Sequence, residues 1–412
     1  MKKLLSFAVS ILLLAACKKN DKLSSQKEND NLAIAAAAGG PGGGGGSACT
    51  INLTNFKQVI RGFGGSSAWH GQLSDADCDK LFTTLGLSIL RVRIDPDGNW
   101  ADEISNAQKA KARGAIVFAS PWSPPAYMKD NNNTVGGSLL PAHYSNYANW
   151  LNSFAGAMDS SGVPLYAVSI QNEPNINVTY ESCTWSATQM FNFMVNNAGV
   201  INTKVMMPET FNYLPSYADP VLNNVTGAAN TDICAHHWYG ANRFQLWTNA
   251  YNKGKDIWMT EYYNNDQSLN AAITTAVDIH KFLTINYDNA YVWWWVKNPD
   301  CNIITNTGIN KRGYVMGQFA KFVRPGYYRV DVTGGTNISA YTSGSKAVIV
   351  AVNSGTSSLT QKFTFQNGTV SSVTPYVTSG TKDMLAGNSV TVSGNSFSYT
   401  LEPKSVTTFV QD

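Results

Sequence analysis

The stretch YAVSIQNEPN, Tyr166–Asn175, runs from apolar β-forming residues directly into an Asn-Glu-Pro corner. A strand that only filled a core could end at glycine or asparagine. This one ends on Glu173, a carboxylate held between an amide and a proline. The stretch therefore predicts a buried strand that delivers a functional side chain to the end of a sheet.

The same pattern recurs along the chain between segments typical of helices. Two of these segments are 145–162 and 186–199, and the second begins with Ser and ends with Gly, as helix caps prefer. Eight apolar strands alternating with helices favour an α/β fold of the (β/α)8 TIM barrel type. A doubly wound open sheet is the alternative, but GFGGSSAW lacks the GxGxxG spacing. The predicted strands lie in VIRGFGG, SILRVRID, AIVFASPW, YAVSIQNEP, KVMMPET, ICAHHWYG, DIWMTEYY and AYVWWWV.

The pattern changes from about Arg324 onward. Residues 324–412 alternate β-branched and polar side chains between Gly, Asn and Ser turns, which predicts an antiparallel β-sandwich. The segment 48–59, which contains CTINLTN, has a similar character, and we expect it to add a strand to that sandwich. The catalytic barrel is then expected over residues 60–323.

The first residues are typical of an export signal. Residues 1–17 combine a positive start with a short apolar stretch and end in LLAAC, which resembles a bacterial lipobox with Cys17 as the lipidated residue. Residues 18–47 end in GGPGGGGGS and predict a flexible linker. We expect an exported protein held to the cell envelope or cell surface by a lipid anchor. Ordinary signal cleavage beside an incidental cysteine is the alternative.

Composition excludes some classes of function. The net charge of +3 is small and spread out, so nothing indicates nucleic-acid binding. Five cysteines remain after Cys17, an odd number without a CxxC pair. We expect at most one or two disulfides, no metal site built on cysteine, and a monomer.

Two carboxylates are the principal catalytic candidates. Glu173 ends the fourth predicted strand and Glu261 ends the seventh, and these strands face each other across the mouth of a closed barrel. Glycosidic bond hydrolysis requires two such carboxyl groups, one to protonate the leaving oxygen and one to attack or stabilise the anomeric carbon. The alternative is that each glutamate is a salt bridge at a strand end.

Neighbouring residues suggest a role for each glutamate. Arg91 or Arg93, on the second strand, could hold Glu261 ionised by charge and hydrogen bonding. Glu173 would then be the protonated group, because two nearby carboxylates resist double ionisation. This makes Glu173 the acid/base and Glu261 the nucleophile. Asn172 could donate to a sugar 2-hydroxyl.

His237 and Tyr239 end the neighbouring strand, where either could orient Glu261. A metal site on the two adjacent histidines is the weaker alternative, because no third ligand follows at a useful spacing. We therefore expect no metal and no cofactor.

Aromatic residues at or beyond the strand ends are expected to form a sugar-binding groove, because sugars present apolar faces to rings. For some of them a core or helix-packing role is the alternative. The candidates are Trp69, Trp122, Tyr127, Trp185, Trp238 and Trp294.

The motifs VIRGFGG, LYAVSIQNEP, CAHHWYG, IWMTE, AYVWWW and INKRGYVMGQFAKFVRPGYYRVD resemble glycoside hydrolase family 30, in particular its bacterial xylanase branch. The resemblance runs from about Cys49 to the C-terminus. It implies a barrel fused to a β-sandwich and retaining endo-cleavage of β-1,4-xylan or xylo-oligosaccharides without metal or cofactor. By position, Glu173 matches the family's acid/base and Glu261 its nucleophile. Trp122, Asn172, Tyr239 and Trp294 match its active-site lining.

One departure from this branch concerns specificity. Members that require a glucuronic acid side chain typically carry two consecutive arginines after the last tryptophan strand, whereas this chain has Lys297 and Asn298. An amide does not replace the bidentate donor of an arginine. We therefore expect an endo-β-1,4-xylanase that does not depend strictly on glucuronate, with a glucuronoxylan-specific enzyme as the alternative. A glycan-binding protein on a decayed scaffold and a β-glucan hydrolase are further alternatives.

Overall fold

The computed structural model describes residues 48–240 and 242–412. The predicted signal peptide, the lipidation site Cys17 and the linker 18–47 lie outside these residues. Within the described part of the chain, no helix is long and apolar enough to cross a membrane.

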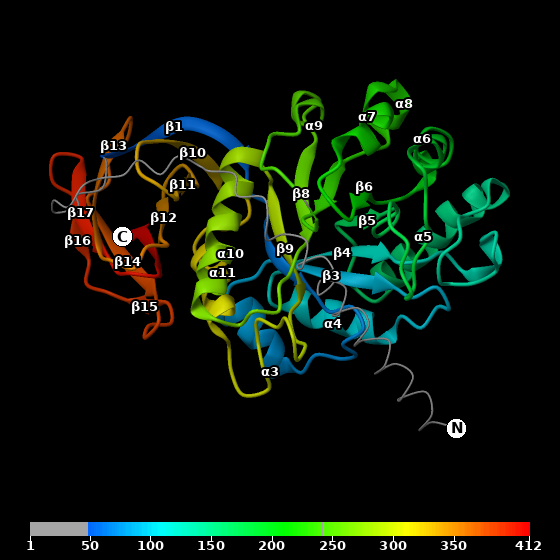
Figure 1. The fold of residues 1–412 in the computed structure, drawn as a ribbon, viewed down its shortest axis with the longest axis horizontal. Helices are drawn as coiled ribbons and strands as arrows, with labels where there is room; N and C mark the ends of the chain where they lie inside the picture. The colour runs from blue at the N-terminus through cyan, green and yellow to red at the C-terminus, as the bar shows by residue number, and fades with distance from the viewer. Residues whose placement is uncertain (1–47, 241) are drawn as a thin grey trace.

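Eight parallel strands close into a barrel in chain order, as predicted (Figure 1). Each predicted stretch supplies one strand. The fourth and seventh strands, which precede Glu173 and contain Glu261, therefore lie on opposite sides of the barrel. The strands are β2 (Gly62–Ser66), β3 (Ile89–Ile94), β4 (Ile116–Pro121), β5 (Ala167–Ser169), β6 (Lys204–Thr210), β7 (Ile233–His237), β8 (Asp256–Glu261) and β9 (Ala290–Trp295).

Helices surround the barrel (Figure 1). The predicted helix at 186–199 begins as expected, with Ser186 in a capping box, but ends earlier, and Gly199 lies in a following 3-10 turn. The predicted helix at 145–162 corresponds to α5. The helices are α3 (Asp75–Cys78), α4 (Ala101–Ala112), α5 (Tyr144–Ser160), α6 (Ala187–Asn196), α7 (Pro215–Asn223), α8 (Val225–Ala229), α9 (Thr248–Asn252), α10 (Leu269–Lys281) and α11 (Lys311–Ala320).

The barrel has a packed interior of its own. Ile89 from β3 and Ala235 from β7 belong to this interior cluster, and Phe118 meets Trp258 edge-on at 5.7 Å. Successive strand residues alternate between the two faces of the barrel wall. Arg91 lies two residues after Ile89, and His237 lies two residues after Ala235, so both also point into the barrel, nearer its carboxyl end. The apolar floor therefore continues directly into polar groups at the mouth.

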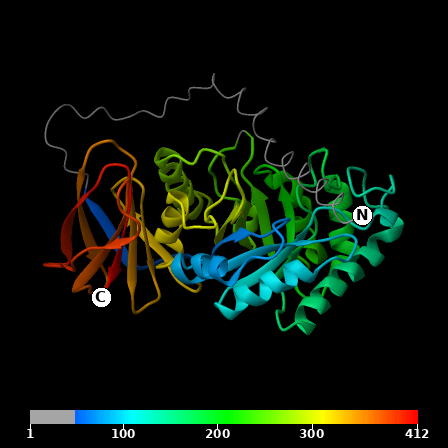
Figure 2. The same ribbon diagram turned by 90° about the horizontal axis from the view of Figure 1, so that it is seen from below.

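The C-terminal strands form an antiparallel sheet domain beside α10 and α11 (Figures 1 and 2). Its strands belong to one continuous sheet, in which β1 pairs with β10 and also runs parallel to β13. Phe363 and Phe397 both contact Phe409, so the two ends of the sheet fold over a shared core as in a sandwich. The strands are β1 (Cys49–Val59), β10 (Tyr328–Thr333), β11 (Ile338–Thr342), β12 (Ala347–Asn353), β13 (Leu359–Gln366), β14 (Ser372–Thr378), β15 (Leu385–Ala386), β16 (Val390–Thr391), β17 (Ser396–Leu401) and β18 (Ser405–Gln411).

The side domain is joined to the barrel through α11. Gln318 donates to Thr378 at 2.8 Å, and the Thr408 hydroxyl donates to the Gln318 carbonyl at 2.8 Å. The five cysteines from Cys49 to Cys301 are buried, and none of them forms a disulfide in the described part of the chain.

Candidate active site

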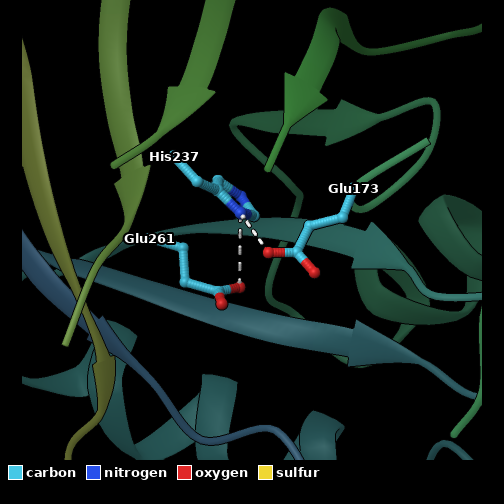
Figure 3. A group of neighbouring side chains, drawn as sticks. All are labelled: Glu173, His237 and Glu261. Carbon is cyan, nitrogen blue, oxygen red and sulfur yellow. Dashed lines mark hydrogen bonds and ion pairs between the residues drawn. The ribbon is translucent and has the colours of Figure 1, made fainter. Parts of the chain in front are cut away.

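The two candidate carboxylates come together at the mouth of the barrel. Glu173 follows β5 and Glu261 is the last residue of β8, and both point toward the imidazole of His237 at the end of β7 (Figure 3). One nitrogen of His237 and one oxygen of each carboxylate all lie within 4.8 Å of one another. This separation is closer to the roughly 5–5.5 Å of retaining glycosidases than to the roughly 6.5–9.5 Å of inverting ones.

Arg91 is the cation beneath this pair. Its side chain is fully buried, and Nη1 donates to Glu261 Oε2 at 2.5 Å while Nη2 donates to Asn172 Oδ1 at 2.7 Å. The guanidinium lies 4.6 Å from the centre of the Trp122 ring. Burial by itself lowers the pKa of Arg91, but the negative charges of Glu209 and Glu261 raise it above its ordinary value. Arg91 therefore remains charged although no water reaches it.

Arg93, the alternative partner for Glu261, has a different role. Its guanidinium pairs with Glu181 and Asp95 and lies 5.0 Å from the Trp69 ring centre. Arg93 therefore supports the rim of the barrel, and Arg91 is the residue that contacts Glu261.

Tyr239 supplies a second donor to Glu261. Its hydroxyl donates to Glu261 Oε1 at 2.9 Å, and Phe211 stacks on its ring at 5.1 Å. Burial and the neighbouring charge of Glu261 raise the pKa of Tyr239 well above its ordinary value. The phenol therefore stays protonated and can donate. Glu261 thus has a cation on one oxygen and a hydroxyl donor on the other.

Glu173 has weaker partners. His237 Nδ1 lies 3.2 Å from Oε1, and the Tyr180 hydroxyl lies 3.5 Å from Oε2. Its backbone has a left-handed φ of 46°, and its N–H donates to the Glu209 carbonyl at 2.9 Å. Arg91 contacts Glu261 directly, whereas Glu173 has a histidine in its place, so the two carboxylates lie in unlike environments. Such asymmetry separates the acid and the nucleophile in glycosidases.

Aromatic rings form the walls around the carboxylates. Trp69 lies 4.7 Å from Trp122 and 6.0 Å from Trp294, measured between ring centres. The cavity between them is lined by Trp69, Trp122, Glu173, Tyr180, Glu261, Tyr263 and Trp294.

A second and larger cavity, of about 440 Å³, adjoins the first across Trp69. Its other walls come from Trp295 and the segment after β9, which is rich in amides. They include Lys297, Asn298, Asn302 and Asn306, and His70, from the segment after β2, completes the lining.

The remaining ring candidates lie elsewhere. Trp185 is buried against Tyr144 and Phe193, so its position does not support a role as a sugar platform. Trp238 packs on Phe244 in the layer outside the barrel. Tyr127 is 61% exposed on a short turn after β4, apart from both cavities, and its role in binding stays a prediction.

Three further residues of the site received no role from the sequence. Glu209 ends β6 and is fully buried, with Oε1 3.1 Å from Arg91 Nη2. Its place at a strand end was a usable signal. Tyr263 lies two residues after Glu261, while Tyr180 comes from a loop in which no pattern marks it.

The Glu173, His237 and Glu261 cluster is compact enough to surround a metal ion. We assign it to acid–base chemistry, because the guanidinium of Arg91 already supplies a positive charge to Glu261 at hydrogen-bond distance. The predicted absence of a metal and a cofactor stays a prediction.

Two carboxyl groups at this spacing, in unlike environments and between aromatic walls, define the protein as a glycoside hydrolase on a TIM barrel. Residues 100–261 match the sequence model of the glycosyl hydrolase family 30 TIM-barrel domain. The chain is 41% identical over 388 residues to the glucuronoxylanase XynC of Bacillus subtilis strain 168, which covers 88% of this chain and 92% of that protein. The chain belongs to glycoside hydrolase family 30, as its motifs indicated.

Solved structures agree with this assignment. A family 30 endoxylanase from Clostridium papyrosolvens C71 is 44% identical with a TM-score of 0.83, over 89% of this chain and 100% of that one. The family 30 subfamily 8 xylanase Xyn30A from Clostridium acetobutylicum is 44% identical with a TM-score of 0.86, over 89% and 99% of the two chains. The predicted fold is therefore confirmed.

Changing Tyr239→Phe removes the hydroxyl that donates to Glu261 and leaves the ring stacked on Phe211. We expect kcat for glycoside hydrolysis to fall about 100–1,000-fold, since one preorganised donor to a reacting group contributes on that order, with little change in melting temperature. Steady-state kinetics and thermal unfolding measure the two effects. Tyr251→Phe, at an exposed tyrosine on α9, is the matched control and should leave kcat unchanged. An unchanged kcat for Tyr239→Phe would show that its hydrogen bond to Glu261 does not contribute.

Proposed function

We propose that the protein is a retaining endo-β-1,4-xylanase that does not depend strictly on glucuronic acid side chains. The observation that carries the hydrolytic part is the pair of unlike carboxylates within 4.8 Å. The xylan part is supported by similarity to proteins named as a glucuronoxylanase, an endoxylanase and a xylanase.

In the first step, Glu261 Oε attacks the anomeric carbon while Glu173 gives its proton to the departing glycosidic oxygen. The products are a glycosyl ester on Glu261 and a free sugar hydroxyl. In the second step, Glu173 removes a proton from water, which attacks the same carbon and releases Glu261. Two inversions at one carbon give net retention of configuration.

Asn172 fits a role in orienting the sugar ring. Its Oδ1 accepts from Arg91, so the opposite end of the amide is the NH2 group, a donor for the 2-hydroxyl of the sugar. Hydrogen bonds to that hydroxyl strengthen in the transition state. Trp69, Trp122 and Trp294 supply flat surfaces for the chain on either side of the cleaved bond.

Independence from glucuronate is supported by the state of Lys297. Its Nζ donates to Asp77 Oδ2 at 2.7 Å. Burial by itself raises the pKa of Asp77, but the bonds from Lys297 and Ser74 outweigh it and hold the pKa at about 2. The ammonium in the larger cavity is therefore already neutralised by a carboxylate. Its neighbour Asn298 cannot supply the charged bidentate fork that grips a uronate.

A glucuronoxylan-specific enzyme is the second candidate. It is supported by the 41% identity to the Bacillus glucuronoxylanase and by the Lys297 ammonium at the wall of a cavity large enough for a sugar branch. A single ammonium would hold a uronate as a point charge, with less specificity than an arginine.

We also propose that the enzyme is exported and tethered through a lipid on Cys17, which LLAAC supports. Expressed in a bacterium with radiolabelled palmitate, the full chain should take up label and sediment with membranes. Cys17→Ser should lose the label and leave the membrane fraction, with Cys49→Ser as the cysteine control. Labelling of Cys17→Ser at the wild-type level would contradict the anchor.

Glu261→Gln keeps the shape of the side chain and removes the nucleophile. We expect xylan hydrolysis to fall by about a thousandfold or more, the order seen when a covalent nucleophile is removed, as measured by release of reducing sugar. Glu402→Gln, at an exposed ion pair with Lys382 in the side domain, is the matched control and should keep wild-type activity. Near-normal activity of Glu261→Gln would contradict the assignment of Glu261 as the nucleophile.

Product analysis separates the two candidate specificities. On linear xylo-oligosaccharides and on glucuronoxylan, we expect kcat/KM values within about tenfold of each other, a difference of about 1.4 kcal/mol. The reason is that Lys297, the lysine in the described lining of the larger cavity, is already paired with Asp77. Cleavage of decorated chains alone, at a fixed position from each branch, would establish the glucuronoxylan-specific enzyme instead. Equal cleavage of β-glucan would point to a third specificity.

A further inference from the structure

The carboxylate of Glu209 contacts neither cavity, yet it lies against the two side chains that contact the catalytic glutamates. Glu209 Oε1 is 3.1 Å from Arg91 Nη2, and Nη1 of the same guanidinium contacts Glu261. The same oxygen is 3.5 Å from Nε2 of His237, whose Nδ1 faces Glu173. Through these two contacts, one fully buried carboxylate is linked to both halves of the catalytic pair.

An irregular backbone conformation turns the Glu209 carboxylate into the barrel. By strand alternation from Met206, which points into the barrel, residue 209 would face outward. Glu209 instead has a left-handed φ of 50°, and the pairing of β6 with β7 shifts register between Pro208 and Thr210. Left-handed φ is uncommon for a residue with a side chain and is found where function requires it. Here it turns the carboxylate inward.

The surroundings of Glu209 hold it in the ionised form. Ser120 donates its hydroxyl to Oε2 at 2.8 Å, and Arg91 pairs with Oε1. Burial by itself raises the pKa of Glu209, but the Arg91 charge and the contacts with His237 outweigh it and hold the pKa at about 2. An ionised carboxylate can only accept hydrogen bonds.

This contact favours Nε2 as the nitrogen of His237 that carries the permanent proton. Glu209 Oε1 faces Nε2 at 3.5 Å without hydrogen-bond geometry, and Nε2 has no hydrogen-bond partner among the residues that the structure describes. A nitrogen facing an ionised carboxylate is stabilised as N–H. Nδ1 is then the nitrogen that can gain or lose a proton, and it faces Glu173 Oε1 at 3.2 Å.

We propose that Glu209 is a positioning residue that holds the proton of His237 on Nε2 and so leaves Nδ1 to share one proton with Glu173. When Glu173 is protonated, its O–H donates to the Nδ1 lone pair. When Glu173 is ionised in the free enzyme, before it donates to a substrate, the same proton lies on Nδ1 of an imidazolium. This inference rests on the acid/base role of Glu173 proposed above.

The other groups around His237 agree with a shared proton. Burial lowers the pKa of His237, but the carboxylates of Glu261, Glu173 and Glu209 outweigh it and raise the pKa above its ordinary value. The ionisable and charged groups that face the Glu209 and His237 pair come from β3, β5, β7 and β8 and the segments after them. They are Arg91, Glu173, Tyr239 and Glu261.

Glu209→Gln tests the charge with the shape retained. A negative charge raises the proton affinity of its neighbours, so removing it lets the Glu173 and His237 pair lose its proton at lower pH. We expect the alkaline limb of kcat/KM on linear xylohexaose to move toward acid by about one pH unit, the size common for loss of a nearby buried charge. Glu103→Gln, at another buried carboxylate, is the matched control and should leave both limbs in place.

A merely structural role for Glu209 would lower activity without moving the limb, and that result would overturn the proposal. The second measurement is the ring nitrogen spectrum of His237 in the wild-type enzyme by proton–nitrogen NMR, which does not depend on turnover or on folding of the variant. A protonated Nε2 across the active pH range is expected. An Nε2 without a proton at the pH optimum would contradict the proposal, even if Glu261→Gln had established the hydrolase.

Discussion

The ion pair between Arg91 and Glu261 is the interaction on which the rest of the site depends. A fully buried guanidinium is tolerated only when its donors are matched by acceptors. Here Glu261, Glu209, Asn172 and Ser120 together provide them, and Trp122 covers its face. The contacts that satisfy this one cation therefore also fix the positions of Glu261, which we propose as the nucleophile, of the Asn172 amide and of the Glu209 carboxylate. The arrangement of the site therefore follows from the need to pair the buried Arg91 charge with carboxylates inside an apolar barrel.

The strands reach this arrangement by breaking their own regularity at the mouth. Trp258 points into the barrel, so alternation would send Glu261 outward. The pairing of β7 with β8 shifts register so that His237 lies opposite Glu261, and the carboxylate enters the mouth. Glu209 achieves the same by a left-handed backbone conformation. Glu173 also has a left-handed φ, and its N–H donates to the Glu209 carbonyl. Irregular backbone is concentrated where the chemistry lies.

These irregularities also mark where sequence analysis succeeded and where it stopped. The alternation of eight apolar strands with helices was sufficient to predict the barrel. The order of the strands was sufficient to place Glu173 and Glu261 on opposite sides of its mouth. Arg91 and Arg93 lie two residues apart on β3 and therefore face the same side of the strand. Which of the two reaches Glu261 depends on the strand register, which the sequence did not give. Trp185 was predicted to line the groove because it lies beyond a strand end, but the structure packs it against Tyr144 and Phe193 of the helix layer. Glu209 was visible at a strand end, whereas its inward direction required the left-handed turn.

We propose that the buried ion pair and the two unlike carboxylates together carry out a double-displacement reaction. The stereochemistry of the first product tests this most directly, because it depends on the carboxyl spacing and not on the identity of any side branch. Proton NMR of xylohexaose during the first minutes of hydrolysis would distinguish the two anomers of the new reducing end before they equilibrate. The account predicts that the β-anomer appears first. Initial formation of the α-anomer would contradict it.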